Sequence, residues 1–292
     1  MNKENRFVIN ESKDGIEITE QHHKVLFFQV QPKSIKGQYE RAGYVHPLYD
    51  LEGNVLTEDG PEDHPYHRGI FWAWHQIVWR NQKIADGWMS ENISFVPVKI
   101  SSSQTGSGAS IHSVMVWKYK TGGAQPIDIL GENTVITVSP SEAGYRIIDF
   151  DISLSPLVDS LALGGSDDIK GYGGFCIRLK LPVDMHFTSR RTPVIPQDTA
   201  VTAGAWMDFT GSFNANTSPG SGMALFCKEP FPAPEQLWIL RNETSMQNIP
   251  YPGRIPLLLS PNGWRLKYRL IVHNATVSQK QLEKLYIEYV SH

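Results

Sequence analysis

The chain has 292 residues and a formal net charge of -3, and 40% of its residues are hydrophobic while 20% are charged. A chain of this length can bury a large core, as one large β domain or as two ordinary domains. It lacks the concentrated basic charge that DNA, RNA or an anionic membrane would require, so we expect no nucleic-acid partner.

The amino-terminal residues lack the apolar segment of a signal peptide, and no run of roughly eighteen apolar residues follows. We therefore expect a soluble chain without a membrane span. The compartment stays open, because a secreted or periplasmic domain begins in the same way once its leader is removed. Cys176 and Cys227 lie in apolar, strand-like runs, which favours free buried thiols over the alternative of one disulfide.

Short runs of alternating apolar and polar residues follow one another along the chain, rich in β-branched and aromatic residues. Gly, Pro, Asn and Ser separate them, as is typical of strands and turns. The runs are 24–31, 71–79, 113–119, 134–139, 145–154, 174–181, 205–209, 222–227, 236–240 and 264–273. So many strands predict an all-β fold of two large packed sheets, because one open sheet of that width would curl or split.

The pattern changes only near the C-terminus, where residues 276–290 have helical periodicity. Ser278 and Gln281 have the spacing of a capping box. The predicted apolar face consists of Leu282, Leu285, Tyr286 and Tyr289. We expect a short helix that packs on the sheets, not a functional element.

No repeat or clear linker divides the sequence, so we predict a single domain over residues 1–292. The most flexible-looking stretch, 211–222, lies between two strand-like runs. This position suits a hairpin loop better than an interdomain linker.

Residues 46–88 contain the densest group of chemically versatile side chains, with four of the ten His and four of the eight Trp. His64, His67 and Arg68 occur together in the run HPYHRG. Ring nitrogens, a guanidinium and aromatic faces suit a hydroxyl-rich ligand. We therefore predict that His64, His67 and Arg68 form the catalytic part of a cleft, in which Arg68 orients the ligand.

An acidic loop precedes this group, and we expect residues 58–63 to form the rim of the cleft. The alternatives are local. His64 and His67 could each cap a backbone group, and Arg68 could hold the loop through Glu62 or Asp63.

The run 71–79 would present alternate residues to opposite faces if it formed one strand. We name Trp72, Trp74, His75, Asp86 and Trp88 as candidate substrate-binding residues. Aromatic residues occur on both faces of the run, so some of these Trp must belong to the core. A metal site that joined His75 to His64 and His67 would require a sharp bend, which Gly69 could supply.

Two further patterns are weaker. Asp149 and Asp151 share one face of a predicted strand, where a solvated surface is the preferred interpretation over an acid/base pair. The glycine-rich stretch 170–174 lacks the strand and helix context of a phosphate-binding loop.

The run HPLYDLEGNVLTEDGPEDHPYHRGIFWAW from His46 resembles the bacterial family labelled methane oxygenase PmoA. The pieces KGYGGFCIRL from Lys170 and RLKYRLIVHNA from Arg265 are also similar to that family. The strand-rich pattern with a His-containing site is similar to the galactose-mutarotase-like supersandwich. That resemblance implies two large antiparallel sheets with a cleft for sugars. Proteins of that architecture include epimerases, lyases and glycoside hydrolases.

From these patterns we predict a carbohydrate-active enzyme that uses His-based general acid/base chemistry, because His can take and give a proton near pH 7. Its expected partner is a small carbohydrate, with no cofactor. The alternatives are a non-catalytic carbohydrate-binding module and a metal-dependent enzyme with His ligands. The sugar, the bond and the oligomeric state stay open.

Overall fold

The computed structural model describes residues 6–190, 192–213, 220–228, 237–243 and 246–291. It is 56% strand, with one helix at the C-terminal end of the described chain. The strand pairs of its two large sheets are antiparallel. The predicted all-β sandwich with a short C-terminal helix is confirmed.

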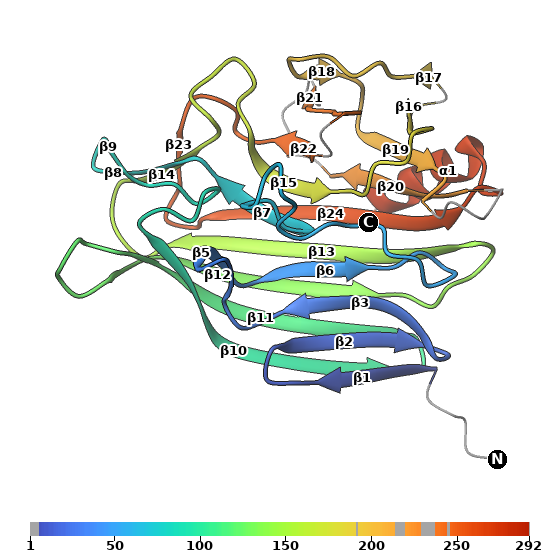
Figure 1. Cartoon of the computed structure of the whole chain (residues 1–292), viewed down its shortest axis with the longest axis horizontal. Coiled ribbons are helices and arrows are strands. Elements are labelled where there is room, and N and C mark those ends of the chain that lie inside the picture. The colour runs from blue at the N-terminus through green and yellow to red at the C-terminus, as the bar shows by residue number, and fades with distance from the viewer. Residues whose placement is uncertain (1–5, 191, 214–219, 229–236, 244–245, 292) are drawn as a thin grey trace.

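The two large sheets stack face to face, with β1 to β3 and β6 lying over β10 to β13 in Figure 1. Within the described residues one sheet has seven strands, in the order β1 (Phe7–Glu11), β2 (Gly15–Glu20), β3 (His23–Gln29), β6 (Tyr44–Leu48), β7 (Ile70–Trp74), β15 (Gly173–Arg178) and β22 (Met246–Pro250). The other has nine, in the order β10 (Ile93–Thr105), β11 (Gly108–Tyr119), β12 (Ile127–Val138), β13 (Tyr145–Pro156), β24 (Trp264–Asn274), β20 (Ser221–Cys227), β19 (Trp206–Gly211), β16 (His186–Ser189) and β17 (Thr192–Pro193).

Three small sheets decorate the sandwich in the described part of the chain. Their strands are β23 (Leu257–Leu258), β14 (Leu161–Gly164), β8 (Gln76–Trp79) and β9 (Gln82–Ala85) in the first, β18 (Val201–Thr202) and β21 (Leu237–Trp238) in the second, and β4 (Lys33–Ile35) and β5 (Gln38–Arg41) in the third. Helix α1 (Gln279–Val290) packs on the outer face of the nine-stranded sheet through Leu282, Leu285 and Tyr289. Its predicted Ser278–Gln281 capping box is present.

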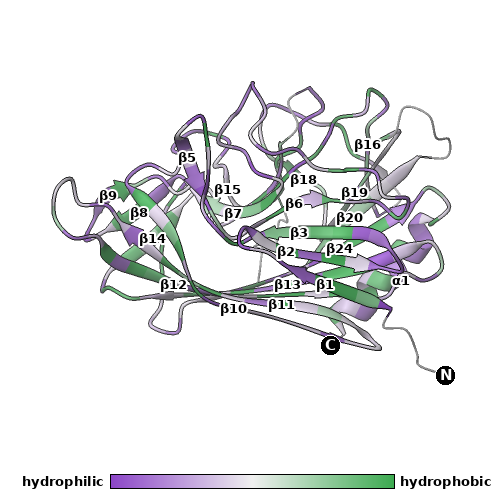
Figure 2. Ribbon diagram, turned by 60° about the horizontal axis from the view of Figure 1, so that its bottom comes forward, coloured by the Kyte–Doolittle hydropathy of each residue, from purple (hydrophilic) through white to green (hydrophobic). Residues whose placement is uncertain are grey.

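Both faces of strand β7 are covered by other parts of the chain, and the site forms on one of them. Ile70, Trp72 and Trp74 point into the main core between the two large sheets. Phe71 and Ala73 point the other way, into a second cluster that contains Trp88, Cys176 and Met246. Figure 2 shows the loops that lie above β7 and β15 on this second face. Loops therefore cover the centre of the seven-stranded sheet on the side away from the main core. We call this side the loop face.

The structure tests several predictions made from the sequence. The run 71–79 is two strands of different sheets, β7 and β8, with His75 at the junction. Strands β19 and β20 form the expected hairpin, although residues 214–219 of its loop and Gln236 of the run 236–240 lie outside the described residues. Cys176 and Cys227 are free and buried, as predicted. Among the described residues no helix is long and apolar enough to cross a membrane.

Candidate functional site

A cavity of about 200 Å³ lies on the loop face of the seven-stranded sheet. Five separate stretches of chain contribute to it: the loop before β7, the end of β7, the loop after β9, the loop before β15, and the start of β22 with the segment before it. The lining residues are His64, Tyr66, His67, His75, Trp88, Lys170, Tyr172, Arg241 and Met246. The predicted His64, His67, His75 and Trp88 therefore meet in one cavity.

His67 is 5% exposed. Its hydrogen bond with Arg178, at the end of β15, determines which ring nitrogen carries the proton. The Arg178 guanidinium donates a hydrogen bond of 3.1 Å to Nδ1 of His67. A nitrogen that accepts a hydrogen bond carries no proton, so the neutral ring holds its proton on Nε2. Burial lowers the pKa of His67 to about 2, and the positive charge of Arg178 acts in the same direction. At neutral pH His67 is thus a hydrogen-bond donor and not a base.

Arg178 also holds the acidic loop that precedes β7. It donates to Glu58 at 2.9 Å and to both carboxylate oxygens of Asp63 at 2.9 and 2.8 Å. Asp63 in turn bonds Nδ1 of His64 at 2.8 Å, and the His64 ring stacks on that of His67 with centroids 4.7 Å apart. Burial would raise the pKa of Asp63, but His64 and Arg178 lower it to about 2. A single arginine thus orders both histidines of the HPYHRG run.

His75 is hydrogen-bonded to the carboxylate of Asp86. Its Nδ1 lies 2.9 Å from Oδ2 of Asp86, whose other oxygen accepts hydrogen bonds from the backbone N–H groups of Trp88 and Met89 at 3.0 and 2.9 Å. Burial alone would raise the pKa of Asp86, but the bonds from His75 and Met89 lower it. Because the carboxylate accepts from Nδ1–H, Nε2 of the neutral His75 ring carries a free lone pair. This arrangement orients an imidazole as a base.

Trp88 lines the cavity, yet it is only 2% exposed and its face is already occupied. His75 stacks on it at 5.0 Å, while His67 meets it edge-on at 5.8 Å. Trp88 therefore holds the two histidines at a fixed spacing. The half-buried rings of Tyr66 and Tyr172 are better placed to meet a ligand.

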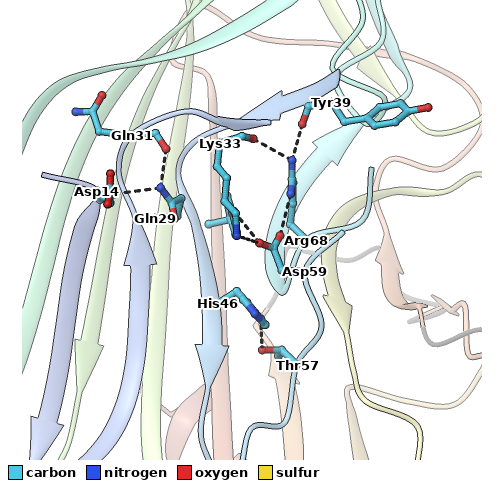
Figure 3. Close-up of polar contacts among 10 residues, drawn as sticks. Asp14, Gln29, Gln31, Lys33, Tyr39, His46, Thr57, Asp59 and Arg68 are labelled. Carbon is cyan, nitrogen blue, oxygen red and sulfur yellow. Dashed lines mark hydrogen bonds and ion pairs between the residues drawn. The ribbon is translucent and has the colours of Figure 1, made fainter. Parts of the chain in front are cut away.

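The expectation that Arg68 lines the cleft is wrong, because Arg68 is fully buried. Figure 3 shows its guanidinium donating to Asp59 at 3.0 Å and to the carbonyl oxygens of Lys33 and Tyr39 at 3.0 and 2.6 Å. Gly69, where a Cβ would lie 2.2 Å from the Val45 carbonyl oxygen, lets the chain pass close to β6 at this point. Arg68 thus fixes the loop, the alternative noted for it, although through Asp59 instead of Glu62 or Asp63.

Trp72 and Trp74 do not line the cavity, because both side chains are buried in the main core on the other side of β7. Trp72 stacks with Phe175, and Nε1 of Trp74 donates to the Tyr251 carbonyl oxygen at 2.6 Å. The strand periodicity separates them from Phe71 and Ala73, which face the loops. Asp86 does not line the cavity either, and it acts on the site through His75.

Sequence reasoning missed Tyr66, Lys170, Tyr172, Arg241 and Met246. Tyr66 lay inside the HPYHRG run, and Lys170 and Tyr172 lay in the glycine-rich loop, where Gly171 has φ +68. Arg178 was missed as well, although an arginine at the end of an otherwise apolar strand indicates a buried ion pair. Arg241 and Met246 have no comparable local signal.

The remaining patterns have structural explanations. Asp149 pairs with Arg269 across β13 and β24 at 2.7 Å, and Asp151 pairs with Arg265 at 2.6 Å. Among the described residues no three His, Cys, Asp or Glu side chains are grouped to hold a metal ion. The guanidinium of Arg178 against His67 would also repel a cation there.

Fold and site together define an all-β sandwich protein with a histidine-lined cavity on the loop face of its seven-stranded sheet. The chain belongs to a family of unknown function, DUF6807, whose model matches residues 15–287. No curated protein sequence matches the chain closely enough to count as a relative. The resemblance to the PmoA-labelled family and to galactose-mutarotase-like proteins stays a prediction.

Proposed function

We propose that this protein is a carbohydrate-active enzyme that works by general acid/base chemistry in the histidine-lined cavity. The observation that carries the proposal is that two imidazoles with different partners line one cavity. His75, held by Asp86, presents a basic nitrogen, whereas His67, held by Arg178, presents an N–H donor.

The two imidazoles have opposite roles because their Nδ1 atoms have opposite partners. A carboxylate next to His75 stabilises the ring when it takes a proton from a substrate hydroxyl or C–H group. Burial, with the guanidinium of Arg178, keeps the His67 ring neutral, so its Nε2–H can stabilise negative charge that develops on a substrate oxygen. Two imidazoles whose neighbours make one a donor and the other an acceptor are suited to acid/base chemistry.

The form of the cavity supports a sugar as the reacting ligand. Its volume of about 200 Å³ is below the ~300–1,000 Å³ of sites for drug-sized molecules, which suits a ligand of monosaccharide size. Tyr66 and Tyr172 supply apolar ring faces together with hydroxyl groups, and the histidines supply polar nitrogens. Ring faces beside polar atoms suit the C–H faces and hydroxyls of a sugar.

The test is a screen of mono- and oligosaccharides for binding by calorimetry and for turnover by product analysis. For a substrate found in this way, His75→Gln should lower kcat by about 10²–10⁴-fold, the usual contribution of a general acid or base, and change Kd only a few-fold. His23→Gln, an exposed histidine at the start of β3, is the matched control and should behave like the parent protein.

Three results would overturn the proposal in different directions. Failure of every saccharide to bind or react would remove carbohydrate as the ligand. Binding without turnover by the parent protein would indicate a carbohydrate-binding module. Stoichiometric transition metal in the purified protein, with activity lost on its removal, would indicate the metal-dependent class.

A further inference from the structure

The charges that line the cavity are cationic. Lys170 and Arg241 both contribute to its wall, and among the described residues no Asp or Glu does. The nearby carboxylates have other partners: Asp86 is bonded to His75, and Asp63 is bonded to His64 and Arg178. A small, partly enclosed cavity of this kind attracts anions, since low-dielectric walls strengthen the field of its charges.

Arg241 is a fixed positive charge. Its guanidinium donates to three backbone carbonyl oxygens, those of Gln197, Leu240 and Asp198, at 2.7, 2.8 and 2.9 Å, and it lies 5.5 Å from the centre of the Tyr172 ring. Each of these partners is uncharged, so the contacts position the guanidinium without neutralising it. Arg241, in the segment before β22, thus brings a positive charge to the cavity wall.

Lys170 lies in a loop that is held by hydrogen bonds to Asp168. Its ammonium has no hydrogen-bond or ion-pair partner among the described residues. The carboxylate of Asp168 accepts hydrogen bonds from Ser166 and from the backbone N–H groups of Lys170 and Gly171, at 2.8, 2.8 and 3.1 Å. Asp168 therefore holds the loop in its conformation. Its carboxylate also interacts electrostatically with Lys170, without an ion pair between them. A half-buried lysine at a cavity wall, with its three donors available, is suited to an anionic group on a ligand.

From this arrangement we infer that the ligand of the cavity is an acidic sugar, a uronic acid or a glycoside of one, whose carboxylate is bound by Lys170 in the field of Arg241. The inference rests on the proposed function and narrows its substrate class. Three N–H groups of Arg241 already bond backbone carbonyl oxygens, so Lys170 is the main direct donor for an anion. A single ammonium suits a carboxylate better than a phosphate ester, which has three acceptor oxygens to satisfy.

Calorimetry with matched pairs of neutral and acidic sugars tests the inference: glucose with glucuronate, galactose with galacturonate, and mannose with mannuronate. At least one uronate should bind ten-fold or more tightly than its neutral partner, and the difference should shrink as salt is raised. Lys170→Met should remove about ten-fold of the uronate affinity and leave the neutral sugar within two-fold. Lys170→Arg should restore most of the loss.

The control is Lys284→Met, an exposed lysine on α1, which should leave every affinity unchanged. Equal affinity for both members of each pair, or an equal effect of Lys170→Met on both, would overturn the inference while the proposed function stands. Tighter binding of glucose 6-phosphate than of glucuronate would overturn the assignment of a carboxylate. If no sugar of any kind binds, the proposed function and the inference fall together.

Discussion

The hydrogen-bonding roles of His67 and His75 are each set by one neighbouring side chain. His67 and His75 line the same cavity and touch the same Trp88 ring, but a guanidinium bonds the first and a carboxylate bonds the second. Proximity to Trp88 alone would not separate them. The partner at Nδ1 decides which ring nitrogen carries the proton, and so decides which histidine donates and which accepts.

Asp86→Asn tests this idea at the scale of one atom. The amide oxygen can still accept from the backbone of Trp88 and Met89, while the amide nitrogen faces His75 and donates to its Nδ1. The proton of the neutral ring then moves to Nε2 and the base is lost. We expect kcat to fall about 100-fold or more with little change in KM.

The tautomer itself can be measured by the ¹⁵N chemical shifts of the His75 ring, without any substrate. Asp86→Asn should exchange the shifts of its two nitrogens. Asp159→Asn, an exposed carboxylate paired with Arg80, serves as the control and should leave them unchanged. Unaltered His75 shifts in Asp86→Asn would show that Asp86 does not set the tautomer.

At the scale of elements, buried charged contacts join strands that sequence separation would keep apart. Arg178 on β15 connects that strand to the loop before β7. A second such contact joins β24, β19 and α1: Asp208 bonds Nε2 of His273 at 2.9 Å and Gln279 at 2.6 Å, while Nδ1 of His273 lies 3.0 Å from the Asn274 carbonyl oxygen. Both nitrogens of His273 therefore face acceptors, which is the environment of a protonated ring.

This contact predicts a stability change on the alkaline side of neutrality. Burial alone would lower the pKa of His273, but the bonds to Asp208 and the Asn274 carbonyl raise it. A raised pKa in the folded state gives stability that is complete below the unfolded value of about 6.5 and is lost as pH rises through the folded value. The advantage of the parent over His273→Gln, measured as the free energy of unfolding in urea, should therefore narrow as pH rises above about 6.5. An advantage independent of pH would contradict a charged His273.

The whole molecule places its site on the less obvious side of the sandwich. The main core lies between the two large sheets, whereas the cavity lies on the loop face, above β7 and β15. Its walls come mostly from loops that are far apart in sequence. They include the imidazole of His67, whose burial lowers its pKa and therefore makes the free energy of unfolding depend on pH. The assembly of the site and the stability of the fold are therefore linked through pH.

Acid should reveal this link. Burial lowers the pKa of His67 to about 2 and that of His46 to about 4, so the unfolded chain binds protons that the folded chain excludes. Stability from each ring is complete above pH 6.5 and falls as pH drops towards the folded value; by pH 5 each ring costs about 2 kcal/mol. His67→Gln should reduce the loss of unfolding free energy between pH 7.5 and pH 5 by that amount, and His46→Gln should do the same. His23→Gln is the control. An unchanged acid dependence in both variants would show that folding does not lower the pKa of either ring.

Much of this protein could be predicted from local patterns in the sequence. Alternation of apolar and polar residues identified most strands of the large sheets, and the 3.6-residue period with Ser278 identified α1, because backbone geometry alone sets both periods. The same alternation separates Trp72 and Trp74 from Phe71 and Ala73. The HPYHRG run and His75 supply all three histidines that line the cavity among the described residues, and sequence position sufficed to single them out.

Only the tertiary structure decided which arginine serves the site. Arg68 is next to His67 in sequence, yet close packing at Gly69 turns it beneath the loop onto Asp59. Arg178 is 111 residues away and reaches His67 because β15 pairs antiparallel with β7. Periodicity is a local property of the backbone, whereas the choice of partner depends on sheet order and register, which no short stretch of sequence contains.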